Sequence, residues 1–426
     1  LNYYEHALYN HILASQDPDM PGCVTYYTSL LPGSFKQYST PFDSFWCCVG
    51  TGMENHSKYA ESIYFKDNQE LLVNLYIPSR LHWKEKGLKL TLDTYFPESD
   101  TVTVRMDEIG SYTGMLLFRY PDWVSGDAVV RINGKPAQTE AHKGSYIRLL
   151  DSVKSGDVIT LVFTRNLYID YAKDEPHFGS VMYGPILLAG GLGTDDMPED
   201  RVIDNRACRE SLPAKNIPML VGPLTDLDSW IQCSSQHPLR FTVKNGGGQQ
   251  GVGLVPYFQM HHQRHTVYWK LYSPDEFVYR TRSLTDEVKI GDETDERKHA
   301  LQGENDSIYW HDYFWAKNTR FRMAKDGWFS YTLHINKTEQ KPYHLICRFW
   351  GDEPDTCQFD ILIDGNYLRT VSLNRKLYLT YVDDVYSIPA DWTRGKDKVN
   401  VTFRAAQGKN AGGLYELKIT SDTNYR

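Results

Sequence analysis

The chain has 426 residues, of which 41% are hydrophobic and 23% are charged, a composition typical of a globular protein with about two to four domains. A net charge of −8 without any run of Lys or Arg argues against nucleic acid or an anionic membrane as a partner and favours a neutral one. Seven cysteines are too few for a disulfide scaffold, and no apolar stretch approaches the roughly 20 residues that span a bilayer.

The first 70 residues are predicted to contain two helices. One face of the first helix carries apolar residues at helical spacing: Leu1, Tyr4, Leu8 and Ile12. This helix should end before Pro18, because the residue before a proline is pushed out of the α region. The second helix is expected to begin near Cys48. It should direct these apolar residues inward: Met53, Ala60 and Ile63 or Tyr64.

From Leu71 onward the pattern changes to alternating apolar and polar residues, which is typical of strands with one buried face. The clearest runs are residues 71–77, 88–95, 101–105 and 157–163. Between them, Asn133-Gly134 predicts a two-residue hairpin turn, because this pair tolerates positive φ angles. We therefore expect a β-sandwich over residues 71–190. Its last element should be a buried strand over residues 179–190, bent at Gly184-Pro185.

The remaining chain is also predicted to be rich in strands. Residues 191–275 form a mixed β accessory region, with strands on either side of a glycine-rich loop at Gly246–Gly248. The acidic run Asp292–Glu296 indicates a connecting or solvated segment. Residues 276–426 are expected to form a second sandwich, because residues 359–366 repeat the hairpin pattern of the first. Aromatic residues there could bind carbohydrate: Trp310, Trp315 and Trp328.

Two adjacent cysteines, Cys47 and Cys48, stand beside several glycines. Neighbouring residues cannot share a disulfide without distorting the backbone, so a metal site, a nucleophile and simple burial are the three explanations. Both reactive roles need the thiolate, and a helix N-terminus or a metal lowers the thiol pKa from roughly 8.5. Two thiolates supply half of a four-coordinate zinc site. The other cysteines lack ligand spacing and are predicted to be buried thiols: Cys23, Cys208, Cys233, Cys347 and Cys357.

The segment from Cys47 to Phe65 closely resembles the signature of the β-L-arabinofuranosidase-like glycoside hydrolases of families 127 and 146. The sequence of this segment is long and specific: CCVGTGMENHSKYAESIYF. The resemblance continues over most of the chain, at residues 5–10, 26–31, 183–189, 255–264 and 384–389.

The resemblance implies a retaining hydrolase built on an (α/α)6 barrel that is followed by β-sandwiches. The expected fold class is therefore mostly β: residues 1–70 are the tail end of the barrel, and two or more β-sandwich (jelly-roll-like) domains follow. Cys47 would attack the anomeric carbon, and Cys47 and Cys48 would both bind zinc. Tyr27 matches a tyrosine that contacts the sugar, although a core aromatic explains this residue equally well.

Two parts of the family's site have no counterpart in this sequence. The general acid/base glutamate and a Glu-x-Cys pair that completes the zinc site lie earlier in the barrel, which places them before Leu1. Cys23 has no Glu-x-Cys context, and Glu54 lies about 10 Å along a helix from Cys47. We therefore expect a C-terminal part that is inactive alone, with zinc absent or weakly bound, and with a missing N-terminal segment or a companion chain.

The implied partner is an arabinose-containing oligosaccharide or glycoconjugate, and the implied location is periplasmic or extracellular. The alternative hypothesis is a non-catalytic carbohydrate-binding or scaffold portion of a polysaccharide-degrading protein.

Other candidate sites are weaker. His261 and His265 would need a helix to share a metal, but they lead into a predicted strand, so a structural or surface role is expected for them and for His262 and Arg264. The loop at Gly246 lacks the Lys-Ser/Thr pair of a phosphate-binding loop.

Overall fold

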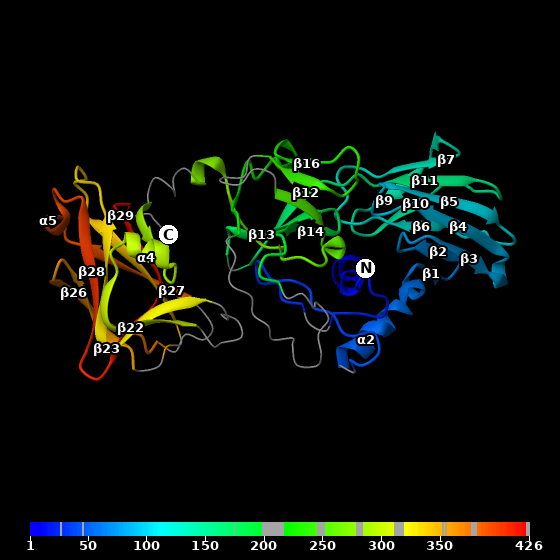
Figure 1. The fold of residues 1–426 in the computed structure, drawn as a ribbon. Helices are drawn as coiled ribbons and strands as arrows, with labels where there is room; N and C mark the ends of the chain where they lie inside the picture. Colours follow the sequence, from blue (N-terminus) through cyan, green and yellow to red (C-terminus); the bar gives the residue numbers. More distant parts are fainter. Residues whose placement is uncertain are drawn as a thin grey trace. The chain divides into compact units, whose positions relative to one another are not determined.

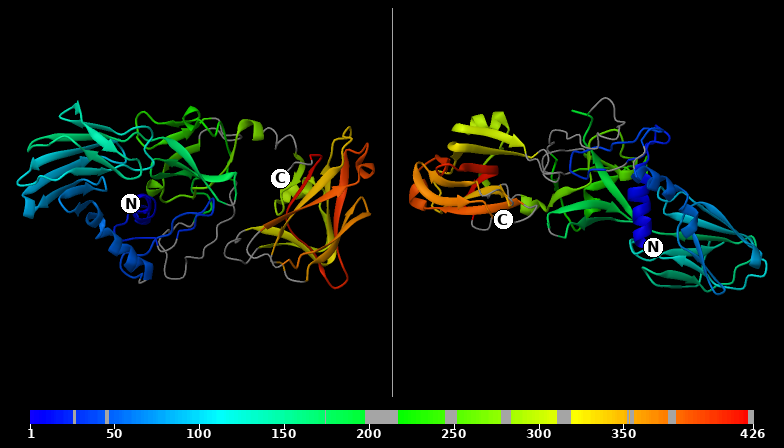
Figure 2. Two further views of the ribbon diagram at one scale, coloured as in Figure 1. Left: turned by 180° about the vertical axis from the view of Figure 1, so that it is seen from behind. Right: turned by 90° about the horizontal axis from the view of Figure 1, so that it is seen from below.

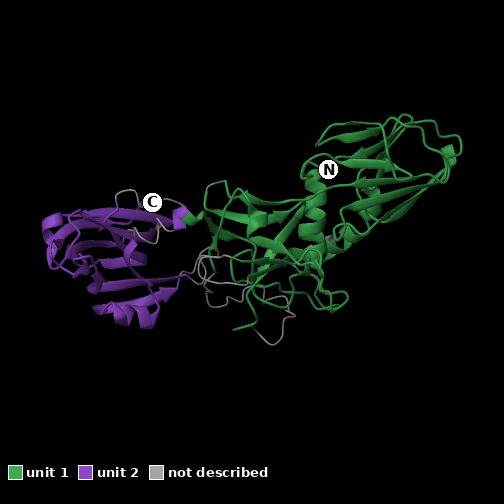
Figure 3. Cartoon of the chain, turned by 90° about the horizontal axis from the view of Figure 1, so that it is seen from above, with its two compact units in different colours: residues 1–274 green, residues 275–426 purple. Residues whose placement is uncertain are grey.

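The computed structural model divides into two compact units, residues Leu1–Pro274 and Asp275–Arg426 (Figure 3). It describes residues 1–25, 28–44, 47–173, 175–197, 217–244, 252–277, 284–310, 319–351, 353, 356–375 and 381–422. Both units are built mainly of strands, so the predicted mostly-β fold with β-sandwich domains is confirmed. No helix in the described residues is long and apolar enough to cross a membrane.

The predicted first helix is present and ends where the sequence indicates. It runs through α1 (Asn2–Ala7), a π-helical turn η1 (Leu8–Ile12) and a 3-10 turn η2 (Leu13–Ser15), and Gln16 is extended. These turns lie beside the hairpin of β13 (Phe178–Tyr183) and β14 (Ile186–Gly191) (Figures 1 and 2).

The second helix, α2 (Cys47–His56), begins where predicted but is shorter than expected. The chain leaves it after His56, passes through the 3-10 turn η3 (Tyr59–Ser62) and enters a strand. This break changes the helical phase, so Ile63 is the only one of the four residues expected to point inward that is buried. The prediction that Met53 and Ala60 point inward is wrong, because both are exposed.

Residues 64–163 form a sandwich of two antiparallel-rich sheets that share one apolar core. One sheet has the spatial order β1 (Tyr64–Asp67), β2 (Glu70–Val73), β6 (Leu116–Arg119), β10 (Tyr146–Leu149), β9 (Thr139–Ala141). The other has the order β3 (Ser79–Trp83), β4 (Leu88–Thr94), β5 (Thr101–Glu108), β11 (Val158–Val162), β7 (Val129–Ile132), β8 (Lys135–Pro136). The turn between β7 and β8 has φ of 48° at Asn133 and 79° at Gly134, which confirms the predicted hairpin.

The next sheet includes residues 167–191, which the sequence placed at the end of the first sandwich. Its spatial order is β15 (Leu220–Val221), β20 (Trp269–Tyr272), β13, β14, β18 (Val252–Pro256), β17 (Phe241–Val243), β16 (Ile231–Cys233). Two short additions are β12 (Leu167–Tyr171) on β13 and β19 (His265–Thr266) on β14. Residues 179–190 are therefore not one bent strand. Gly184 takes a positive φ of 57° and lets β13 and β14 fold back on each other as a hairpin.

Unit 2 is a single sheet that encloses its own core, because inward residues of nearly all its strands belong to one buried cluster. The spatial order is β26 (Asn366–Ser372), β25 (Gln358–Ile363), β28 (Lys398–Ala405), β23 (Arg320–His334), β29 (Asn410–Thr420), β24 (Tyr343–Trp350), β27 (Tyr381–Ile388). At its margins β21 (Leu284–Val288) pairs with β29, and β22 (Gln302–Trp310) pairs with β23. The short helix α5 (Ala390–Thr393) follows β27.

The acidic run Asp292–Glu296 connects β21 to β22 and is largely exposed, as the sequence suggested, but it also begins helix α4 (Glu293–Lys298), and its last residue is buried. Asp292 caps the helix by accepting hydrogen bonds from the backbone N–H groups of Thr294 and Asp295, both 3.0 Å away. Glu296 is only 3% exposed, and its carboxylate accepts hydrogen bonds from Arg322 and Tyr331. An acidic first turn also suits the positive end of a helix, so these charges favour the helix here.

Candidate active site

Cys47 is the first residue of α2, and its side chain is exposed. The thiol therefore lies at the positive end of a ten-residue helix, where backbone N–H groups favour negative charge. An exposed thiol in this position can act as a nucleophile or as a metal ligand. Cys48 follows in the same helix, but its side chain lies outside the described part of the structure, as does Tyr27.

The other described cysteines differ in burial. Cys23, Cys347 and Cys357 are buried as predicted, and burial raises the pKa of each thiol, to about 11 for Cys357. These thiols stay protonated at neutral pH and are chemically inert. The prediction of burial is wrong for Cys233, which ends an outer strand of its sheet and is exposed. Cys208 lies outside the described residues.

The end of α2 is held by a short chain of polar contacts. Gln16 Nε2 lies 2.6 Å from His56 Nε2, and His56 Nδ1 hydrogen-bonds to the Tyr59 hydroxyl. Burial lowers the pKa of His56, so its ring is neutral at neutral pH. Glu54 is exposed on the same helix.

The N-terminal helix is fixed to the first sandwich by a buried ion pair. Glu5 and Arg119 are each 2% exposed, and the Arg119 guanidinium donates to the Glu5 carboxylate. Trp123 Nε1 donates to the second carboxylate oxygen at 2.7 Å, and Arg119 also donates to Asn2 at 3.1 Å. Burying a charge is unfavourable unless it is paired in this way, so these contacts set the position of α1.

Asn10 fixes the same helical segment to the β13–β14 hairpin. Its fully buried side chain donates to the Pro185 carbonyl and accepts from the Leu187 N–H, both at 2.8 Å. The side chain thus replaces a strand partner at the turn of the hairpin. Both segments were singled out in the sequence, at residues 5–10 and 183–189, and the structure brings them together.

A second pair of distant segments meets through the loop between the two N-terminal helices. Lys36 is buried, donates to the Tyr257 carbonyl at 2.8 Å and lies 4.2 Å from the centre of the Tyr257 ring. Burial lowers the pKa of Lys36 to about 7. Arg264 Nε donates to the Gly33 carbonyl at 2.7 Å, and the Gly33 N–H donates to the His265 carbonyl at 2.8 Å.

His261 and His265 are part of this contact rather than of a helical metal site. His261 Nδ1 lies 2.5 Å from the Tyr38 hydroxyl, and His261 Nε2 lies 2.6 Å from the Phe258 carbonyl oxygen. Burial lowers the pKa of both His261 and His265 to about 4, so the two rings are neutral at neutral pH. Their role is structural, in keeping with the sequence analysis.

Two groups of described side chains have metal-ligand spacing, and neither includes Cys47. One joins His262 to Asp17 and Asp19, with His262 Nε2 at 3.0 and 3.2 Å from their carboxylate oxygens. The other lies in unit 2 and joins Asp286, His299 and His334. Sequence reasoning did not find either group, because each one assembles residues from separate segments.

Two segments of unit 1 match the models of known protein domains. Residues 1–61 match the model of the β-L-arabinofuranosidase GH127 catalytic domain, and residues 70–165 match that of the GH127 middle domain. Two adjoining segments of the chain thus match glycoside hydrolase domains. The predicted resemblance to the β-L-arabinofuranosidase-like family 127 is confirmed. Residues 168–271 and 281–420 match a domain and a family of unknown function.

Solved structures give matches at low sequence identity. A structure described as a glycoside hydrolase is 20% identical, with a TM-score of 0.47, over 64% of this chain and 49% of its own. A GH127 β-L-arabinofuranosidase from Geobacillus stearothermophilus T6 is 17% identical, with a TM-score of 0.43, over 63% and 46%. The C-terminal carbohydrate-binding module of family 6 from a laminarinase of Zobellia galactanivorans is 13% identical, with a TM-score of 0.22, over 32% and 97%.

The chain spans about half the length of the glycoside hydrolase structures that it matches. No curated protein matches it.

Proposed function

We propose that the chain is part of a retaining glycoside hydrolase of the β-L-arabinofuranosidase type, in which Cys47 is the nucleophile. The observation that carries the proposal is the exposed Cys47 thiol at the start of α2, inside a segment that matches a GH127 catalytic domain. The neighbouring Cys48 also carries a thiol. Cys23 is a poorer candidate, because it is buried and the pKa of its thiol is raised.

The proposed reaction is a double displacement. Cys47 Sγ attacks the anomeric carbon and forms a C–S bond while the glycosidic C–O bond breaks, and the leaving oxygen takes a proton from a general acid. Water, deprotonated by the same group acting as a base, then attacks the anomeric carbon, and the thiolate leaves. Two inversions at one carbon give overall retention.

Cys47 and Cys48 would hold a zinc ion, because thiolates are ligands that zinc favours. Zinc, when bound, keeps coordinated thiols deprotonated at neutral pH. The resemblance to family 127 places a Glu-x-Cys pair and the general acid outside the segment that carries Cys47. We propose that these residues belong to a segment or chain beyond this one, and that this chain is inactive alone.

An arabinose-containing oligosaccharide or glycoconjugate is the proposed substrate, and a periplasmic or extracellular location is proposed with it. The net charge of −8 fits a neutral sugar better than a polyanion.

The test is hydrolysis of an aryl β-L-arabinofuranoside by the full protein that contains this chain. Cys47→Ser should abolish hydrolysis while circular dichroism shows an unchanged fold. Cys233→Ser, which removes another exposed thiol of unit 1, should leave the rate unchanged. Undiminished hydrolysis by Cys47→Ser would refute the nucleophile assignment. Hydrolysis by this chain alone would refute the proposal that the general acid belongs to another segment or chain.

Unit 2 has one observation in favour of a second function, carbohydrate binding. Trp310 at the end of β22 is 48% exposed, whereas Trp328 is half-buried and Trp315 lies outside the described residues. The Arg320 guanidinium lies 4.5 Å from the Trp310 ring, and an exposed indole face suits a sugar ring. Trp310→Ala should weaken binding of arabinan fragments by the whole chain, and equal binding by this variant would contradict the proposal.

A further inference from the structure

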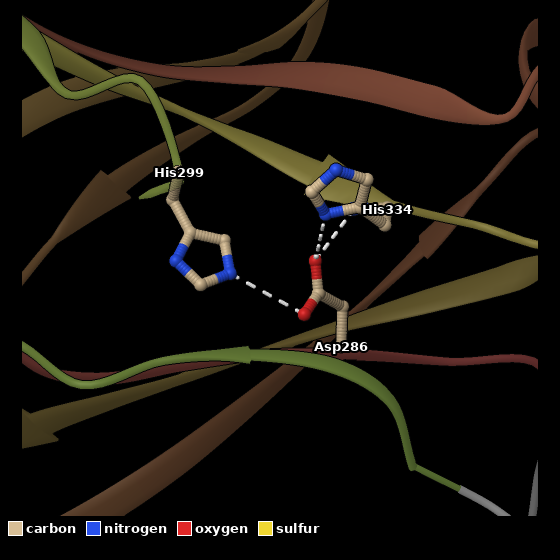
Figure 4. Close-up of side chains that lie close together, drawn as sticks. All are labelled: Asp286, His299 and His334. Atoms are coloured by element: carbon tan, nitrogen blue, oxygen red, sulfur yellow. Dashed lines mark hydrogen bonds and ion pairs between the residues drawn. The ribbon is translucent and has the colours of Figure 1, made fainter. Parts of the chain in front are cut away.

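Three side chains from separate elements of unit 2 meet at one point: Asp286 on β21, His299 directly after α4, and His334 at the end of β23 (Figure 4). His299 Nε2 lies 3.3 Å from Asp286 Oδ1, and His334 Nδ1 lies 3.1 Å from Asp286 Oδ2. One nitrogen or oxygen atom from each residue lies within 4.8 Å of the other two.

The hydrogen bonds of His299 determine which ring nitrogen carries the proton. His299 Nδ1 lies 2.7 Å from the Asp295 carbonyl oxygen, which can only accept, so Nδ1 is the donor. In the neutral ring, Nε2 then has a lone pair that faces the Asp286 carboxylate oxygen. The two atoms lie 3.3 Å apart, so one metal ion can bind both of them. A histidine that donates one N–H to a carbonyl and offers its other nitrogen is the usual arrangement of a metal ligand.

Backbone contacts hold the three ligands in place. The His334 N–H donates to Asp286 Oδ2 at 2.6 Å, and the Thr332 N–H donates to the His299 carbonyl at 2.7 Å. A register shift between Leu284 and Asp286 interrupts the pairing of β21 with β29, as a β-bulge does. Bulges re-aim side chains, and here the aspartate points to the two histidines.

The spacing and burial suit one type of ion. Zinc binds imidazole nitrogen at about 2.0–2.1 Å and carboxylate oxygen at about 2.0–2.2 Å, so tetrahedral ligands lie roughly 3.3 Å apart. Imidazole ligands exclude calcium and magnesium, which take oxygen. The His299 side chain is 7% exposed, Asp286 17% and His334 65%, so the group is closed on one side and open to solvent on the other.

We propose that Asp286, His299 and His334 bind a zinc ion, with water as the fourth ligand. The ion links β21, the end of α4 and the end of β23, and it stabilises this side of unit 2. The site does not depend on the proposed hydrolase activity, and it shares no residue with the proposed thiol site.

The test uses the full chain with Cys47→Ser and Cys48→Ser, so that zinc at the thiols cannot contribute. After equilibrium dialysis against zinc, metal analysis should find about one ion per chain. His334→Ala changes an exposed residue and should preserve the fold. Removing a residue that only hydrogen-bonds to a metal ligand typically weakens metal binding by roughly 10–100-fold. His334→Ala removes a ligand itself, so it should weaken zinc binding by at least this factor. His262→Ala removes the histidine of the other described group and should leave binding unchanged.

Zinc should also raise the melting temperature of the chain with an intact site, but not that of the His334→Ala variant, because only a folded site binds the ion. Absence of zinc binding, or equal binding with and without His334, would overturn the proposal and leave direct hydrogen bonds of Asp286 with the two histidines as the role of the group. Either result leaves the role of Cys47 to be decided by its own hydrolysis test.

Discussion

Replacing Glu5 by Ala should strongly destabilise unit 1. The substitution leaves the Arg119 guanidinium, 2% exposed, without its carboxylate, and it leaves the Trp123 indole N–H without its acceptor. Removing one partner of a buried ion pair costs about 3–5 kcal/mol, because the other charge stays buried and uncompensated. Arg119 keeps its hydrogen bond to Asn2, so we expect a loss near the lower end, about 3 kcal/mol.

Urea denaturation followed by circular dichroism measures this loss, and the melting temperature should fall by roughly 6–12 °C for a unit of this size. The double variant Glu5→Met/Arg119→Met should recover much of the lost stability, because apolar replacement of a whole buried pair is often neutral. Glu61→Ala removes the carboxylate of an exposed pair with Lys58 and should cause no resolvable change. A loss below about 1 kcal/mol for Glu5→Ala would show that this ion pair does not hold α1 in place.

Two further predictions concern unit 1. The unfolded chain keeps the proton of Lys36 up to its ordinary pKa of 10.5, whereas burial lowers the folded pKa to about 7. The free energy of unfolding should therefore rise as the pH increases between these values. Urea denaturation at several pH values should show this rise for the unchanged chain but not for Lys36→Met. Equal slopes of unfolding free energy against pH for the two proteins would contradict the argument that Lys36 is buried. In the sheet that contains β14 and β18, a Cβ atom added at Gly190 would lie 2.4 Å from the Trp269 ring, whereas one added at Gly253 would have open space. Gly190→Ala should cost about 1–3 kcal/mol and Gly253→Ala should not lower the melting temperature, so equal melting temperatures would refute the packing described here.

Local sequence patterns predicted those helices, strands and turns that are determined by residues close together in the sequence. The alternating run at residues 88–94 is a strand with the expected buried face, and Asn133-Gly134 forms the expected turn. The start of α2 at Cys47 also follows from its local sequence. The signature around Cys47 predicted a resemblance to glycoside hydrolase family 127, and the matches to the catalytic- and middle-domain models confirm that resemblance.

The remaining features depend on partners that lie far away in the sequence. Glu5 pairs with Arg119, and Asn10 pairs with the turn after Gly184, over more than a hundred residues. Glu296 looked solvated because its neighbours are acidic, but Arg322 on another element neutralises it in the interior. The ligands around Asp286 likewise come together only through the fold, so spacing along the chain gives no signal for them.

The nucleophilic role of Cys47 is tested most directly by labelling the nucleophile with an epoxide, whose ring opens as the thiolate forms a C–S bond and the epoxide C–O bond breaks. The full protein would be incubated with a β-L-arabinofuranose-configured epoxide, digested and analysed by peptide mass spectrometry. The proposal predicts one adduct, on the sulfur of Cys47, and its loss in Cys47→Ser but not in Cys233→Ser. An adduct on a carboxylate, or labelling that persists in Cys47→Ser, would contradict it.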